Sequence, residues 1–286
     1  ACAIAAEPGV IVTTFGDLIR VPGSHSSLER ERACGADIRV VQSSLDVLHI
    51  ARDNPNRQVV FLGIGFETTA PTTAAAIAQA ARDGVHNIFV LSAHKVMKPA
   101  MMALVTGGVS LDGYICPGHV SIVTGAAMYE EIVAECGVGC VISGFEPVDI
   151  LLAILMLVRQ AEHGEPAVEI AYKRAVTWDG SRPAQRLMDE VFAPRDAVWR
   201  GLGNIPASGL GLSSDYRRFD AERAFNVNLP AAEEPAGCRC GDVLKGMCEP
   251  VDCPLFGAPC TPENPVGACM VSSEGTCAAH HRYQNE

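Results

Sequence analysis

The chain has 286 residues, of which 48% are hydrophobic, and carries a formal net charge of -11. This length and composition predict a globular protein of about two domains. The negative charge argues against nucleic acid and anionic membranes as partners, because both attract basic surfaces. Since no apolar run approaches the roughly 18 residues that a membrane helix needs, we expect a soluble chain. It opens at Ala1, inside what reads as the end of a helix, so we expect a piece of a longer protein.

Short apolar runs alternate with helical patterns through the first half of the chain. The runs are Val10–Phe15, Ile38–Val41, Val59–Ile64, Ile88–Leu91, Gly113–Ile115 and Val138–Ile142. The helical patterns are Leu45–Arg52, Pro71–Arg82, Met97–Leu104, Ile122–Ala134 and Val148–Gln160. Ser43 or Ser44 suits the N-cap of the first of these helices. Apolar strands separated by helices indicate an α/β protein with a buried parallel sheet.

Four polar residues follow strands of this series. They are Glu67, His94, His119 and Glu146, and both glutamates end a Gly-Phe-Glu tripeptide. Ligands and partners meet open parallel sheets at the carboxyl ends of the strands, so we expect these side chains to face one rim. Two plainer interpretations stay open: each glutamate caps a helix N-terminus, and each histidine is a hydrogen-bonded loop residue.

Beyond Gly164 the alternation loosens. An apolar run at Val168–Val176 precedes expected helices at Arg182–Val191 and Asp215–Phe225, and residues 229–237 read as a linker rich in Pro, Ala and Glu. Gly201 and Gly203 lack the third glycine and the strand context of a dinucleotide-binding turn. The pattern therefore gives only weak support to a dinucleotide cofactor, and there is no P-loop either.

Seven of the twelve cysteines lie between Gly237 and Ala279. They are Cys238, Cys240, Cys248, Cys253, Cys260, Cys269 and Cys277. Gly and Pro interrupt the intervals, which excludes one long helix or a regular strand. Because such a segment buries little apolar surface, bound metal or disulfides must hold it. In a reducing compartment dense cysteines more often bind metal, and zinc remains a rival to iron.

Several blocks of sequence occur in a distinctive order. They are Thr13–Asp17, Arg20–Ser24, Gly65–Pro71, Pro117–Ser121, Gly144–Pro147, Asp252–Gly257, Cys260–Pro262 and Met270–Gly275 followed by Cys277. Together they resemble the signature blocks of the HypD family of hydrogenase maturation factors, and the resemblance covers the whole chain. It implies two parallel-sheet α/β domains with helices on both faces, plus a small Cys-rich iron–sulfur domain. The implied limits are 1–57 for the remainder of the first α/β domain, 58–165 for the second, 166–229 for a segment that returns to the first, and 230–286 for the [4Fe-4S] domain.

The resemblance also implies a function: a redox-active cytoplasmic scaffold, rather than a simple enzyme, that assembles the Fe(CN)2CO group of [NiFe]-hydrogenase. The implied partners are a HypC-type chaperone and a HypE-type cyanide donor, and Fe(CN)2CO would be held transiently by the full-length protein. The family's Cys-Gly-Thr-His-Thr-His and Gly-Pro-Gly-Cys-Pro-x-Cys blocks do not occur in this chain. We therefore expect it to lack the iron-anchoring cysteine. An α/β binding protein with a structural zinc module is the alternative, and a metal-free α/β enzyme with a disulfide-bonded tail comes last.

Four cysteines are expected to hold the cluster under this resemblance. Cys253 and Cys260 lie beside Pro or Gly in the blocks most similar to the family's. From the Cys238-x-Cys240 pair we favour Cys240, because Gly241 follows it. For the fourth ligand we favour Cys277 over Cys269. The predicted set is therefore Cys240, Cys253, Cys260 and Cys277, with Cys238 and Cys269 as alternates.

Overall fold

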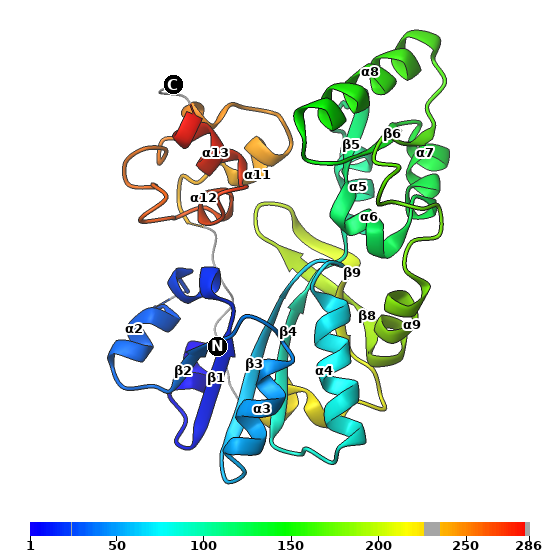
Figure 1. Cartoon of the computed structure of the whole chain (residues 1–286). Helices are drawn as coiled ribbons and strands as arrows, with labels where there is room; N and C mark the ends of the chain where they lie inside the picture. The colour runs from blue at the N-terminus through cyan, green and yellow to red at the C-terminus, as the bar shows by residue number, and fades with distance from the viewer. Residues whose placement is uncertain (24, 226–234, 284–286) are drawn as a thin grey trace.

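The computed structural model describes residues 1–23, 25–225 and 235–283. Two parallel sheets and an antiparallel ribbon form its framework (Figure 1). The first sheet has the order β2-β1-β3-β4, with β1 Val10–Thr14, β2 Ile38–Val40, β3 Gln58–Gly65 and β4 Ile88–His94. The second has the order β5-β6-β7, with β5 Gly113–Pro117, β6 Gly139–Ser143 and β7 Val168–Ile170. The predicted α/β class with parallel sheets is confirmed.

Helices cover both faces of the first sheet because its strands are apolar on both sides. One face, with Ile11 and Phe61, packs against the helices α3 (Asp46–Asp53) and α4 (Ala70–Arg82). The opposite face, with Val12, packs beside α1 (Cys2–Ala5), the 3-10 turn η1 (Gly16–Arg20) and α2 (Leu28–Ala33). Successive residues of a strand point to opposite faces, which explains how one run feeds two cores.

The expected N-cap of α3 is wrong. The helix begins at Asp46, and its N-cap position is Leu45 rather than Ser43 or Ser44. The Asp46 carboxylate accepts the backbone N–H of Ser43 at 2.9 Å, so this side chain replaces the expected hydroxyl in closing the turn.

The expected limit between residues 57 and 58 falls inside the first sheet. β3 pairs directly with β1, with Val12 opposite Val60, and β4 continues the same sheet. The domain limits themselves stay a prediction.

The second sheet carries the helices α5 (Met97–Thr106), α6 (Gly118–Thr124), α7 (Glu130–Cys136) and α8 (Pro147–His163). The expected single helix from Ile122 to Ala134 is wrong: α6 ends at Thr124, a 3-10 turn η2 (Ala127–Tyr129) follows, and α7 starts afresh. Gly125 has a φ of 82°, and a Cβ placed on it would lie 2.3 Å from the carbonyl oxygen of Trp178. The chain leaves the helix there because only glycine fits that close approach.

The chain then returns to the first sheet through α9 (Arg182–Val191), β8 (Phe192–Trp199) and β9 (Gly203–Leu212). β9 lies along β4, where the Ser92 hydroxyl donates to the carbonyl of Leu210 at 2.6 Å. The expected helix Asp215–Phe225 is instead two short turns, η3 (Arg217–Phe219) and α10 (Ala221–Ala224). Asp220 divides them because its carboxylate accepts the N–H of Glu222 and so starts a new helix.

Residues 235–283, named here the cysteine segment, contain only short elements. They are α11 (Cys240–Leu244), the 3-10 turn η4 (Pro250–Asp252), α12 (Ala268–Val271) and α13 (Thr276–Tyr283). The predicted absence of one long helix or a regular strand agrees with this, while most of the expected linker lies outside the described residues. Among the described helices, none combines the length and the apolar character required to cross a membrane.

Candidate functional site

Thiols form the interior of the cysteine segment. Cys240, Cys253, Cys260, Cys269 and Cys277 are buried, whereas Cys238 and Cys248 are partly exposed. Val243, Met270 and Ala278 are the buried apolar residues packed with them. Sulfur therefore occupies the place that aliphatic side chains fill in an ordinary core.

Backbone amides point at two of these sulfur atoms. The N–H of Cys269 donates to Sγ of Cys240 at 3.3 Å, and the N–H of Val266 donates to Sγ of Cys260 at 3.3 Å. A hydrogen bond to sulfur favours the thiolate, which is the form that binds metal. Such bonds are also one of the means by which proteins tune an iron–sulfur cluster.

The four predicted ligands lie near one another. Burial raises the pKa of the Cys277 thiol above its ordinary range; the contact with Cys269 lowers it, and the neighbouring thiols of Cys240, Cys253 and Cys260 raise it further. The Sγ atoms of Cys269 and Cys277 are only 3.0 Å apart. Since Cys269 is as buried as Cys277, the choice between these two stays a prediction.

Glycine gives the thiols room. A Cβ on Gly267 would lie 2.8 Å from Sγ of Cys238 and 3.6 Å from Cβ of Cys240. The thiols therefore pack directly against the backbone of Gly267, and a side chain at this position would displace the Cys238 sulfur. Within the described ranges, no three His, Cys, Asp or Glu side chains are arranged to hold a single metal ion.

Glu67 follows β3 and caps the N-terminus of α5, in line with the plainer of its two interpretations. Its Oε1 accepts the N–H of Met97, the first residue of α5, at 2.9 Å. Oε2 is buried and has no hydrogen-bond partner among the described residues. Burial raises the pKa of this carboxyl, while the bond from Met97 lowers it. Glu67 therefore links the first sheet to a helix of the second.

His94 ends β4 as a fully hydrogen-bonded core residue. Its Nδ1 lies 3.3 Å from the carbonyl of Gly65 and its Nε2 lies 3.1 Å from Oγ1 of Thr73. The ring is 1% exposed and packs edge-on against Phe192. Burial lowers the pKa of His94 to about 4, so the ring is neutral at pH 7. It forms part of the core beneath the rim.

His119 and Glu146 lie at the ends of strands of the second sheet and are exposed. The ring of His119 lies 4.5 Å from that of Phe145, the residue before Glu146. The Glu146 carboxylate forms an ion pair with Arg174 at 3.4 Å. The four candidates therefore do not face one rim: Glu67 and His94 are buried at the first sheet, whereas His119 and Glu146 are exposed at the second.

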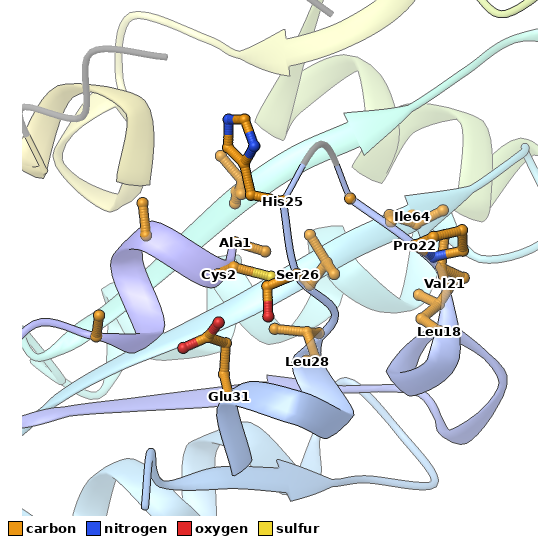
Figure 2. Close-up of a pocket in the computed structure, with 15 residues that line it drawn as sticks. Ala1, Cys2, Leu18, Val21, Pro22, His25, Ser26, Leu28, Glu31 and Ile64 are labelled. Atoms are coloured by element: carbon orange, nitrogen blue, oxygen red, sulfur yellow. The ribbon is translucent and has the colours of Figure 1, made fainter. Parts of the chain in front are cut away.

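An apolar cavity of about 540 Å³ opens on the α1 and α2 face of the first sheet. Figure 2 shows Cys2 and Glu31 on one side of it, with Leu18, Val21 and Ile64 on the other. Burial raises the pKa of the Cys2 thiol, which keeps it protonated at pH 7. The volume suits a small ligand or an inserted side chain. The sequence pattern had not pointed to this cavity.

Helix α8 exposes an unusual number of apolar side chains. Val148 is 74% exposed, Leu151 66% and Val158 47%. With Leu155 they follow helical spacing along one face, and Phe145 extends the surface toward His119. Contiguous apolar surface of this kind marks interaction sites. The sequence showed a long apolar helix but could not show which face stays uncovered.

The sequence also did not predict that two buried cysteines of the second sheet lie side by side. Cys116 on β5 and Cys140 on β6 point into the same core, since Cys140 is opposite Tyr114, two residues before Cys116. Burial raises the pKa of the Cys116 thiol, and the Cys140 thiol beside it raises it further. Strand register, which the sequence alone did not give, was the missing signal.

Comparison with known proteins gives a consistent picture. The HypD family model, described as "Hydrogenase formation hypA family", matches residues 1–284. The chain is 47% identical to hydrogenase maturation factor HypD2 of Bradyrhizobium diazoefficiens, covering 98% of the chain and 76% of that protein. It is 49% identical to HypD of Rhodobacter capsulatus and 47% identical to HypD of Cupriavidus necator, again covering 98% of the chain and 76% of each relative.

Proposed function

The chain belongs to the HypD family of hydrogenase maturation factors, and from that premise we propose that it is a redox-active scaffold for assembly of the Fe(CN)2CO group of [NiFe]-hydrogenase. The observation that carries the proposal is the buried cluster of thiols with N–H groups directed at Cys240 and Cys260. A role in hydrogenase maturation follows from family membership. The cluster, the partners and a cytoplasmic location are proposed.

The cysteine segment fits a [4Fe-4S] cluster in its donor chemistry. Four thiolates ligate such a cluster, and the segment supplies buried thiols with little apolar core of their own. We assign the ligands as Cys240, Cys253, Cys260 and Cys277. A bound cluster would supply electrons; the chain's own residues exclude water from the sulfurs, donate N–H groups to two of them and leave room beside Gly267.

The decisive experiment is metal and sulfide analysis of anaerobically purified protein. We expect iron and acid-labile sulfide with visible absorption, and loss of both in Cys253→Ser or Cys260→Ser. Cys248→Ser is the matched control, because this partly exposed thiol is outside the assigned set and should leave the content unchanged. Stoichiometric zinc in a colourless protein would favour the alternative, a structural zinc module on an α/β binding protein.

The exposed face of α8 supports the proposed docking of a HypC-type chaperone. An exposed apolar helix face of this kind is typical of a protein–protein interaction site. Leu151→Ala removes most of a side chain that is 66% exposed and therefore leaves folding intact. We expect it to weaken binding by about 5- to 30-fold, the equivalent of about 1–2 kcal/mol of lost apolar burial.

Val198→Ala is the control for this measurement, since Val198 is 70% exposed but belongs to β8, outside the α8 surface. Titration calorimetry with the purified chaperone compares the two variants. Equal affinities for Leu151→Ala and the wild type would refute docking at α8. The same protein mixed with a HypE-type cyanide donor tests the second proposed partner.

A further inference from the structure

The tip of the β8–β9 hairpin touches the cysteine segment through a pair of glycines. Gly201 lies in the turn with a φ of +82°, and Gly241 is the second residue of α11. A Cβ built on Gly201 would lie 2.8 Å from both Cα and N of Gly241. A Cβ built on Gly241 would lie 2.2 Å from the carbonyl oxygen of Gly201. Neither side of this backbone contact can accept a larger residue without separating the two segments.

This contact lies directly beside a candidate cluster ligand. Gly241 follows Cys240, whose thiol is 2% exposed and accepts the N–H of Cys269. Whatever fixes Gly241 therefore fixes the position and the burial of the Cys240 sulfur.

The hairpin is also fastened to the rim of the first sheet, close to its tip. Nε1 of Trp199 donates to Oγ of Ser208 at 2.7 Å, and Nζ of Lys95 donates to the carbonyl of Val198 at 2.8 Å. The Trp199 ring lies 5.9 Å from that of Phe66, the residue before Glu67. Figure 1 shows the ribbon reaching from the first sheet toward the cysteine segment. Because the strand ends beside the turn are held at these points, the tip can act as a fixed seat.

Helix α5 of the second sheet meets the same junction. A cavity of about 160 Å³ is lined by Ala103 and Leu104 of α5, by Leu202 and Ile205 of the hairpin, and by Lys245 just after α11. All three parts of the molecule thus converge at the hairpin tip.

We propose that Gly201 and Gly241 are positioning residues whose backbone contact seats the cysteine segment against the strand-end rim. This contact between Gly201 and Gly241, called the seat below, determines how far water reaches the Cys240 sulfur. The effect of this contact on a bound cluster rests on the proposed function, but the positioning of the cysteine segment by Gly201 and Gly241 does not.

Gly201→Ala and Gly241→Ala test the seat, and Gly203→Ala is the matched control. Gly203 has a φ of +80°, so alanine suffers the same backbone strain there as at Gly201, but nothing lies within 4 Å of its Cβ position. We expect amide hydrogen exchange across residues 199–203 and 240–244 to quicken at least about tenfold in both contact variants. In Gly203→Ala the exchange of residues 240–244 should match the wild type.

The reduction potential of the anaerobically purified protein gives the second readout. Reduction adds negative charge, which water stabilises, so exposing the Cys240 turn should raise the potential in both contact variants but not in Gly203→Ala. Loss of iron and sulfide from the contact variants alone supports the same seat, because Cys240 would have been displaced.

The outcomes separate the seat from the proposed function. Unchanged exchange in Gly241→Ala, or equal acceleration at residues 240–244 in Gly203→Ala, overturns the seat. Faster exchange with an unchanged potential overturns its effect on the cluster. A wild-type protein without iron and sulfide refutes the proposed function, and the exchange comparison still decides the seat.

Discussion

Replacing His94 by glutamine should change how stability depends on pH. Burial lowers the pKa of His94 from 6.5 to about 4. Since the folded state binds the proton less readily than the unfolded chain, the stabilisation is complete above pH 6.5 and is lost as the pH falls toward 4. A depression of this size corresponds to about 3 kcal/mol, a large part of the roughly 5–15 kcal/mol that holds a domain folded.

His94→Gln removes this titration and the edge-on contact with Phe192, which contributes about 0.5–1.5 kcal/mol. We expect the variant to be less stable than the wild type at neutral pH, and the wild type to lose about 3 kcal/mol relative to the variant as the pH is lowered to 4. Urea unfolding followed by circular dichroism at a series of pH values measures it. His119→Gln, the same change at an exposed ring, should stay within about 0.5 kcal/mol of the wild type at neutral pH. A difference between His94→Gln and the wild type that is constant across the pH range would refute the reasoning.

Three further predictions concern the two sheets. Burial raises the pKa of Glu67, so its contribution to the free energy of unfolding is present below pH 4.5 and is lost as the pH rises. Glu67→Gln should therefore gain stability relative to the wild type above pH 4.5. A pH-independent difference in urea unfolding would contradict this. Gly125→Ala, at a φ of 82° and facing the Trp178 carbonyl, should cost about 2 kcal/mol or more; an unchanged melting temperature would show that the loop can move aside. Tyr129→Phe removes the hydroxyl bonded to Ser121 at 2.9 Å and should cost about 1 kcal/mol in the same melt, unless a variant of equal stability shows the bond to contribute nothing.

The sequence predicted the succession of buried strands because their composition leaves little alternative. Val59–Ile64 has apolar residues on both faces and is bounded by turn residues, so a central parallel strand was the natural interpretation. β8 and β9 escaped prediction because Pro194, Arg195 and Asp196 break the apolar pattern. A two-stranded ribbon with one side open tolerates such polar residues.

At the candidate site the sequence singled out the candidate residues but did not indicate which of them are exposed. His94 and His119 both follow strands, yet one is buried and the other packs on Phe145 at the surface. That difference depends on what covers each strand end, which is a long-range property. The contact between Gly201 and Gly241 was invisible for the same reason: its partners come from separate segments.

The path of the chain also has a consequence for the order in which the protein folds. The second sheet uses one continuous stretch of sequence, so its contacts are available as soon as that stretch exists. The β4 edge of the first sheet must wait for its cover, because the hydrogen bond between Ser92 and Leu210 spans 118 residues. Closing so long a loop is slow, and partly folded chains with uncovered strands tend to aggregate. We therefore expect the second sheet to form during synthesis while β4 remains exposed at the edge of its sheet, until the ribosome releases β9 to cover it.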